Sequence, residues 1–240
     1  MFRSSPHLVT QTIDSRSPLA SLLSLAVVFG VILGGAARYA YGTAAPALAV
    51  FGTAVIFCSY GLAHGYPHPV LGACNGVTLA RVAMVAFLVG ALAVPDASAW
   101  LVFGVALVAF ALDGVDGWLA RRAGLVSDFG ARFDMETDAG LGAVIAVWLL
   151  ASGTAGPEIL VLGFMRYAFV AASFFAPALR APLPEAFRRK AICVVQIAAL
   201  ILLTFPLTPS IIALPLGIGA ALLLSWSFLI DILWLTGRSG

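Results

Sequence analysis

Long apolar runs, separated by short breaks rich in proline, glycine or charge, make up most of this chain. The breaks lie near residues 66–69, 95–96, 156–157, 182–184 and 206–209. Each run is close to the roughly 20 residues that an α-helix needs to cross the hydrocarbon of a bilayer. The pattern therefore predicts eight spanning helices, near residues 18–41, 45–64, 76–94, 98–120, 133–152, 157–179, 188–206 and 209–236.

The composition places this helical pattern in a membrane. Hydrophobic residues make up 62% of the 240 residues and charged residues only 10%, whereas soluble domains carry roughly 25% charged residues. A water-soluble domain of this length cannot bury so much apolar surface, so we expect an all-α, polytopic integral membrane helical bundle. The net charge of +2 and the absence of basic runs interleaved with aromatics give no sign of a nucleic-acid partner. The three scattered cysteines predict neither a disulfide framework nor a thiolate metal site.

Basic residues indicate how the bundle is oriented. If the N-terminus is cytoplasmic, all of the 13 Lys and Arg residues except Arg38 and Arg166 fall on or near the inner side. The positive-inside rule then places both termini in the cytoplasm, most simply at a bacterial inner membrane. Arg3 and Arg16 precede the first apolar run, but that run is long and continues into further spans. We interpret residues 1–17 as a cytoplasmic segment and 18–41 as an uncleaved helix.

Four aspartates stand out at the predicted cytoplasmic ends of two consecutive helices. Asp113 and Asp116 are three residues apart and Asp134 and Asp138 are four apart, so each pair occupies one helix face. The short connection between the pairs can bring the two faces together. Four carboxylates at close range repel one another unless cations lie between them. Oxygen ligands of this kind suit Mg²⁺ or Mn²⁺, and two such ions could assist a displacement at phosphorus.

The same segment matches the pattern D-x2-D-G-x2-A-R-x8-G-x3-D-x3-D, and this pattern resembles the signature of the CDP-alcohol phosphotransferase family. In the helix before it, Asn75, Thr78 and Arg81 resemble an Asn-x2-Thr-x2-Arg element of many members. The sequence RRKAICVVQ loosely resembles the start of the fifth core helix of the family. The resemblance covers about residues 72–236 and six helices. It implies a family domain over 72–240, with two additional N-terminal transmembrane helices over 18–71. The matched positions of the long pattern are Asp113, Asp116, Gly117, Ala120, Arg121, Gly130, Asp134 and Asp138.

The resemblance implies a role for each matched position. The four aspartates would bind two divalent cations, and Asp138 would also be the base that deprotonates an acceptor hydroxyl. The reaction would be attack by an alcohol on the lipid-side phosphorus of a CDP-lipid such as CDP-diacylglycerol, releasing CMP. The resemblance also favours a homodimer in the membrane. The nucleotide and its diphosphate would be bound by Gly117, Ala120, Arg121 and Gly130, together with Asn75, Thr78 and Arg81.

The acceptor is predicted less directly. Arg166 lies inside an apolar run, and ionisable residues at such depth usually face a bundle interior or a wet cavity. With Arg188, Arg189 and Lys190 it would suit a phosphorylated alcohol such as glycerol 3-phosphate or inositol phosphate. The three residues from 188 to 190 could instead anchor the protein to anionic lipid. Serine, choline or phosphatidylglycerol remain alternative acceptors.

Two other functions compete with this reading. An intramembrane prenyltransferase would also use aspartates and Mg²⁺, but its two motifs are typically separated by several helices. An ion-coupled carrier would be expected to show paired repeats, and no internal repeat is evident here.

Overall fold

The computed structural model describes residues 17–94, 96–181, 183–184 and 186–237. Over this part of the chain there are eight α-helices, one short 3₁₀ helix and no strand, which confirms the predicted all-α bundle. Nearly all of the expected cytoplasmic segment 1–17, including Arg3 and Arg16, lies outside the described residues, as does Arg238. The elements are α1 (Pro18–Tyr41), α2 (Ala45–Gly65), α3 (Gly72–Ala91), α4 (Ala99–Ala123), α5 (Asp128–Ala151), α6 (Ile159–Phe175), η1 (Pro177–Arg180), α7 (Phe187–Thr204) and α8 (Ser210–Gly237).

Five of these helices, α1 to α4 and α8, are long and apolar enough to cross a membrane. The other three differ for visible reasons: α5 carries the acidic residues, the first turn of α7 carries three basic residues, and α6 has 17 residues. The expected helix 157–179 is thus shorter than predicted, because Pro177 begins a separate 3₁₀ turn. The helices expected to begin at 76 and 133 begin earlier, at Gly72 and Asp128.

The turn between α4 and α5 sets the spacing of the two acidic helices. Gly124 ends α4 with a φ of 66°, a left-handed conformation that favours glycine. Its neighbour Leu125 donates its N–H to the carbonyl of Ala120 at 3.0 Å. The Ser127 side chain then caps α5 by accepting the N–H of Gly130 at 3.1 Å. Because both helix ends are capped within a few residues, α5 returns directly alongside α4.

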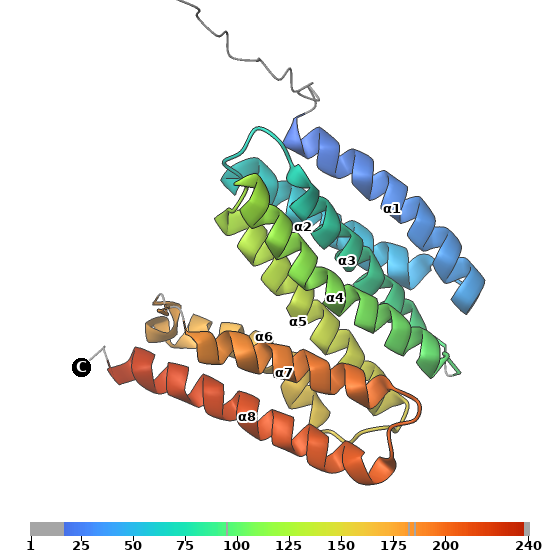
Figure 1. Cartoon of the computed structure of the whole chain (residues 1–240), viewed down its shortest axis with the longest axis vertical. Helices are drawn as coiled ribbons and strands as arrows, with labels where there is room; N and C mark the ends of the chain where they lie inside the picture. Colours follow the sequence, from blue (N-terminus) through green and yellow to red (C-terminus); the bar gives the residue numbers. More distant parts are fainter. Residues whose placement is uncertain (1–16, 95, 182, 185, 238–240) are drawn as a thin grey trace, which may run out of the picture.

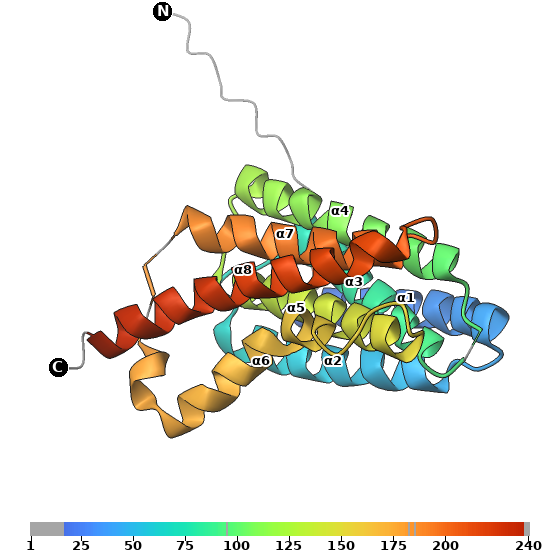
Figure 2. The ribbon, with the colours of Figure 1, turned by 90° about the horizontal axis from the view of Figure 1, so that it is seen from below.

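The bundle has two parts, with α5 between them. Figure 1 shows α1 to α4 on one side of α5 and α6 to α8 on the other, and α5 contacts α3, α6 and α7. The α4–α5 turn, the α6–α7 connection and the end of α8 lie at the same end of the bundle in Figures 1 and 2. Most of the described basic residues lie near this end, whereas Arg38 lies in the last turn of α1 at the opposite end. Which side of the membrane this end faces stays a prediction.

Close packing of α5 against α6 depends on Gly163. A Cβ at this position would lie 2.6 Å from the Ala146 Cβ and 3.2 Å from the carbonyl oxygen of Gly142. We therefore expect Gly163→Ala to lower the free energy of unfolding by about 1–3 kcal/mol, because the two helix backbones must separate. Thermal unfolding in detergent measures this change. Gly104→Ala in α4 is the matched control, since open space surrounds that position; equal destabilisation by both substitutions would contradict the prediction.

Candidate active site

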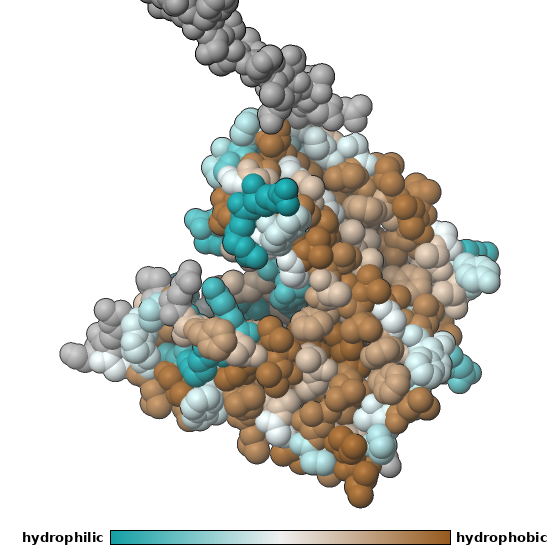
Figure 3. All heavy atoms as spheres, in the orientation of Figure 1, coloured by the Kyte–Doolittle hydropathy of each residue, from teal (hydrophilic) through white to brown (hydrophobic). Residues whose placement is uncertain are grey.

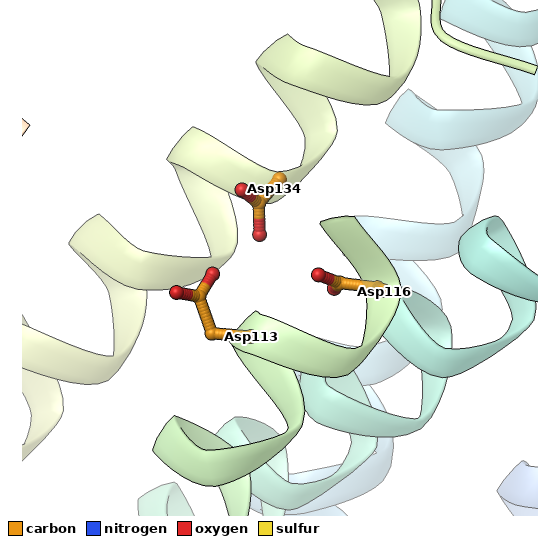
Figure 4. A group of neighbouring side chains, drawn as sticks. All are labelled: Asp113, Asp116 and Asp134. Atoms are coloured by element: carbon orange, nitrogen blue, oxygen red, sulfur yellow. The ribbon is translucent and has the colours of Figure 1, made fainter. Parts of the chain in front are cut away.

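Carboxylates from two neighbouring helices converge at the end of the bundle where α4 meets α5. Asp113 and Asp116 project from α4 and Asp134 from α5, and Figure 4 shows the three pointing into a common space. One carboxylate oxygen from each lies within 4.8 Å of the others. The predicted meeting of the two acidic helix faces is therefore present in the structure.

Arg81 of α3 lies at the centre of this cluster and is fully buried. Its Nη1 donates to Asp116 Oδ2 at 2.8 Å, lies 3.2 Å from Asp113 Oδ1 and also donates to Asp134. Its Nη2 donates to Asp138. The Nε donates to the backbone carbonyl of residue 109 at 3.1 Å. One guanidinium group therefore holds carboxylates from both acidic helices, and we name Arg81 with its four aspartates the acidic cluster.

The acidic cluster is buried on one side and open on the other. The Asp116 side chain is only 4% exposed and accepts a hydrogen bond from the Thr78 hydroxyl at 3.0 Å. The side chains of Asp113, Asp134 and Asp138 are about one third exposed. Figure 3 shows a hollow lined by hydrophilic residues between the two parts of the bundle. Because these three side chains are partly exposed, a polar ligand could reach their carboxylates.

The donor set of the acidic cluster fits divalent cations. If all four aspartates are ionised, the single positive charge of Arg81 leaves three negative charges uncompensated. Asp113, Asp116 and Asp134 offer only carboxylate oxygens, which suit hard cations such as Mg²⁺ or Mn²⁺. Asp138 is not in this group of three and lies beside it on the other terminal nitrogen of Arg81. The structure thus gathers three predicted ligands closely and places the fourth next to them.

The predicted nucleotide-binding residues fall into three groups. Gly117 lies under the Arg121 guanidinium, because a Cβ there would be 3.3 Å from Arg121 Nη1. Arg121 is exposed, and no hydrogen bond or ion pair joins it to another described residue. Ala120 is half-buried on the same helix. This group is open to a ligand, whereas Arg81 and Thr78 are buried against the aspartates.

Asn75 and Gly130 pack the ends of α3 and α5 together. The Asn75 Nδ2 donates to the Leu71 carbonyl at 2.6 Å and to the Tyr66 hydroxyl at 3.1 Å. A Cβ on Gly130 would lie 3.6 Å from Asn75 Oδ1. The pKa of the Tyr66 hydroxyl is raised, mainly by burial and to a smaller extent by the nearby Cys74. The hydrogen bond from Asn75 acts in the opposite direction and lowers this pKa. These contacts fix the turn before α3; contact of Asn75 or Gly130 with a nucleotide stays a prediction.

The predicted acceptor residues each have a partner in the chain. Arg166 of α6 forms an ion pair with Glu136, an exposed residue of α5. Arg188 donates to Ser227 and to Asp231 Oδ1, the latter at 2.5 Å.

The remaining acceptor candidates lie beside these. Arg189 Nη1 lies 3.6 Å from Asp231 Oδ1, and Arg189 also donates to the Pro184 carbonyl. Lys190 is exposed on the next position of α7. Sequence reasoning overlooked Asp231, although a buried acid within an apolar helix is itself a signal of a polar partner.

Arg166 and Arg189 lie on two helices that both pack against α5. Their ion-pair partners are Glu136 of α5 and Asp231 of α8, not the aspartates of the acidic cluster. Binding of an acceptor by these arginines stays a prediction.

Comparison with known proteins adds one finding. A family model described as CDP-alcohol phosphatidyltransferase matches residues 72–232. The match begins at the first residue of α3 and reaches into α8, and it leaves α1 and α2 outside. No curated protein and no solved structure matches the chain.

Proposed function

Because the chain belongs to the CDP-alcohol phosphatidyltransferase family, we propose that it transfers the phosphatidyl group of CDP-diacylglycerol to a phosphorylated alcohol and releases CMP. The family itself is one of enzymes that transfer a phosphatidyl group from a CDP-alcohol, so the chain is an enzyme of phospholipid synthesis in a membrane. The observation that carries the proposal is the acidic cluster, which brings the family's aspartates together in space.

The donor diphosphate is proposed to bind over the acidic cluster. Arg121 has free donors above Gly117 and offers a planar fork that suits a diphosphate. Divalent cations held by Asp113, Asp116 and Asp134, with Asp138 beside them, would neutralise the diphosphate and the departing CMP. Arg81 keeps the aspartates in place from the buried side. Binding and charge neutralisation supply most of the catalysis in such transfers.

Asp138 is proposed as the general base. Its side chain is about one third exposed, so an acceptor hydroxyl can reach it, whereas Asp116 is buried. The hydroxyl oxygen attacks the lipid-side phosphorus, its proton passes to Asp138, and the bond from phosphorus to the oxygen of CMP breaks. Arg166 of α6 and Arg189 of α7 lie on helices that pack against α5, and they would bind the phosphate of glycerol 3-phosphate or inositol phosphate. That phosphate would replace Glu136 as the partner of Arg166.

The decisive experiment supplies purified protein with CDP-diacylglycerol and a panel of acceptors, and measures CMP and the mass of the lipid product. We expect product with a phosphorylated alcohol, only when Mg²⁺ or Mn²⁺ is present. Product with serine, choline or phosphatidylglycerol instead would replace the proposed acceptor but keep the reaction. Absence of CMP with every acceptor in the panel would contradict the proposed donor. Release of CMP also distinguishes a transferase from an ion-coupled carrier, which would release none.

Arg166→Ala tests the acceptor site. Loss of a hydrogen bond between charged groups costs about 1.5–3 kcal/mol, so we expect KM for the phosphorylated acceptor to rise about ten- to a hundredfold. The KM for CDP-diacylglycerol should change little. Arg38→Ala, at the other end of the bundle, serves as the control. An unchanged acceptor KM would remove Arg166 from the site.

Two further proposals rest on the family resemblance and the charge distribution. We propose a homodimer, which the mass of the detergent-solubilised protein tests. We also propose that the acidic cluster faces the cytoplasm, since most described basic residues lie at that end. Labelling of single cysteines from either side of the membrane tests this orientation.

A further inference from the structure

A groove lies between α2, α3 and α5, and none of the four aspartates of the acidic cluster lines it. Its volume is about 680 Å³, which is within the roughly 300–1,000 Å³ of ligand-binding pockets. Val50, Ala54 and Phe57 of α2 form one wall, and Val82 and Val85 of α3 form part of the floor. Because α2 lies outside the family match, this groove exists only where the additional helices meet the family domain.

Helix α5 separates the groove from the acidic cluster. Asp134 and Asp138 lie on the face of α5 that meets Arg81. Phe133, Thr137 and Gly140 line the groove from another face of the same helix. Since successive residues of a helix turn by about 100°, these positions point in clearly different directions. The groove therefore lies against a different face of α5 from the one that carries Asp134 and Asp138.

Most of the groove lining is apolar, and its charged residues all come from α5. The first half of α5 contributes Asp128, Arg132 and Glu136, and the Glu136 carboxylate forms an ion pair with Arg166 of α6. Arg132 is exposed, and no hydrogen bond or ion pair joins it to another residue in the described part of the chain. The groove thus combines a hydrocarbon-like channel with an available cation at its mouth.

We propose that this groove binds a phospholipid of the surrounding bilayer, with one acyl chain along α2 and the phosphate at Arg132. Both α2 and α3 qualify as membrane spans, so lipid is the medium next to the groove. From Val50 to Gly65, α2 rises by roughly 22 Å, enough for a chain that spans one leaflet of about 15 Å. An empty apolar groove would forfeit contacts that a chain supplies. A guanidinium is well suited to a lipid phosphate.

The proposal gives the additional N-terminal helices a role. The lipid chain would fill the space between α2 and the family domain and so join the two. Phe129 already contacts α2, because a Cβ on Gly61 would lie 3.2 Å from its ring. The bound lipid would extend this contact along the groove towards Val50.

The test measures phospholipid retained by the full-length protein after extensive washing in detergent, by mass spectrometry of the extract. We expect wild-type protein to retain phospholipid and Ala54→Trp to lose most of it, because the indole fills the groove. Ile56→Trp is the matched control, since Ile56 is 70% exposed on another face of the same helix. Arg132→Gln should lower retention of phospholipid while leaving the groove open. Equal retention by wild type and Ala54→Trp would overturn the proposal.

A second measurement does not depend on the bulky substitution. Cys58 also lines the groove, so bound lipid should slow its reaction with a membrane-permeant maleimide. Cys193→Ser provides the background, because Cys193 is exposed and Cys74 is buried. Adding phosphatidylglycerol vesicles to delipidated protein should restore protection. Protection by CDP-diacylglycerol alone would assign the groove to the donor and overturn the proposal. Neither phospholipid retention nor the maleimide reaction of Cys58 depends on transferase activity. A negative result in both tests would therefore leave the proposed function standing.

Discussion

Asp138→Asn is expected to lower the rate of CMP release by about 10²–10⁴-fold, the usual contribution of a general base. The amide cannot take the acceptor's proton, although its oxygen can still accept a hydrogen bond from Arg81. The side chain is close in size to the original, so the fold should be retained. CMP formation from CDP-diacylglycerol under saturating acceptor measures the effect, with size-exclusion chromatography to check the fold.

Two comparisons make the Asp138 experiment specific. Asp96→Asn applies the same chemical change to an exposed residue of the α3–α4 loop and should leave the rate unchanged. Asp116→Asn should also reduce turnover, but through weaker binding of the divalent cation, so a higher concentration of Mg²⁺ or Mn²⁺ should partly restore it. Near-normal turnover by Asp138→Asn would remove Asp138 from the role of base.

Arg81→Met is expected to lower the free energy of unfolding by about 3–5 kcal/mol, since it removes the cation from a buried charge network. Arg81 is fully buried and contacts all four aspartates of the acidic cluster. Methionine fills much of the same volume but supplies no charge and no donor. The carboxylates would then repel one another, and the Ala109 carbonyl would lose its partner. Thermal unfolding in detergent without divalent cations measures the loss.

Added Mg²⁺ should stabilise Arg81→Met more than it stabilises wild type, because the variant lacks the internal cation. Arg121→Met is the control: Arg121 is exposed and has no partner among the described residues, so its loss should change stability by no more than about 0.5 kcal/mol. Equal sensitivity of Arg81→Met and wild type to Mg²⁺ would show that Arg81 does not serve as the counter-charge of the aspartates.

Much of the architecture follows from the order of residues alone. Apolar runs of bilayer length predicted eight spanning helices. Eight α-helices form over the described residues, and five of them are long and apolar enough to span a membrane. Their ends were harder to predict, as α6 shows. Its apolar sequence continues past residue 175, but Pro177 cannot extend the helix without losing a backbone hydrogen bond. A hydropathy pattern depends on the side chains and does not show that proline lacks a backbone N–H.

The acidic pairs were predictable because residues three or four apart share a helix face and the connection between the helices is short. The place of Arg81 was not predictable in this way. It lies 35 residues before Asp116 and 57 before Asp138, and only the packing of α3 against α4 and α5 brings its guanidinium to them. The sequence suggested that Arg81 lines a nucleotide cleft; the structure places it in a buried position behind the carboxylates.

The sequence by itself determined the membrane class, the number of helices, the carboxylate faces of α4 and α5 and the resemblance to the family. Only the tertiary structure decided which charges meet: Arg166 with Glu136, Arg188 with Asp231, and Arg81 with the aspartates. It also created the groove between α2 and α5. The reason is that helical periodicity fixes the direction of a side chain only relative to its own helix. The rotation and separation of neighbouring helices depend on contacts such as that of Gly163 with Ala146, between residues far apart in the chain.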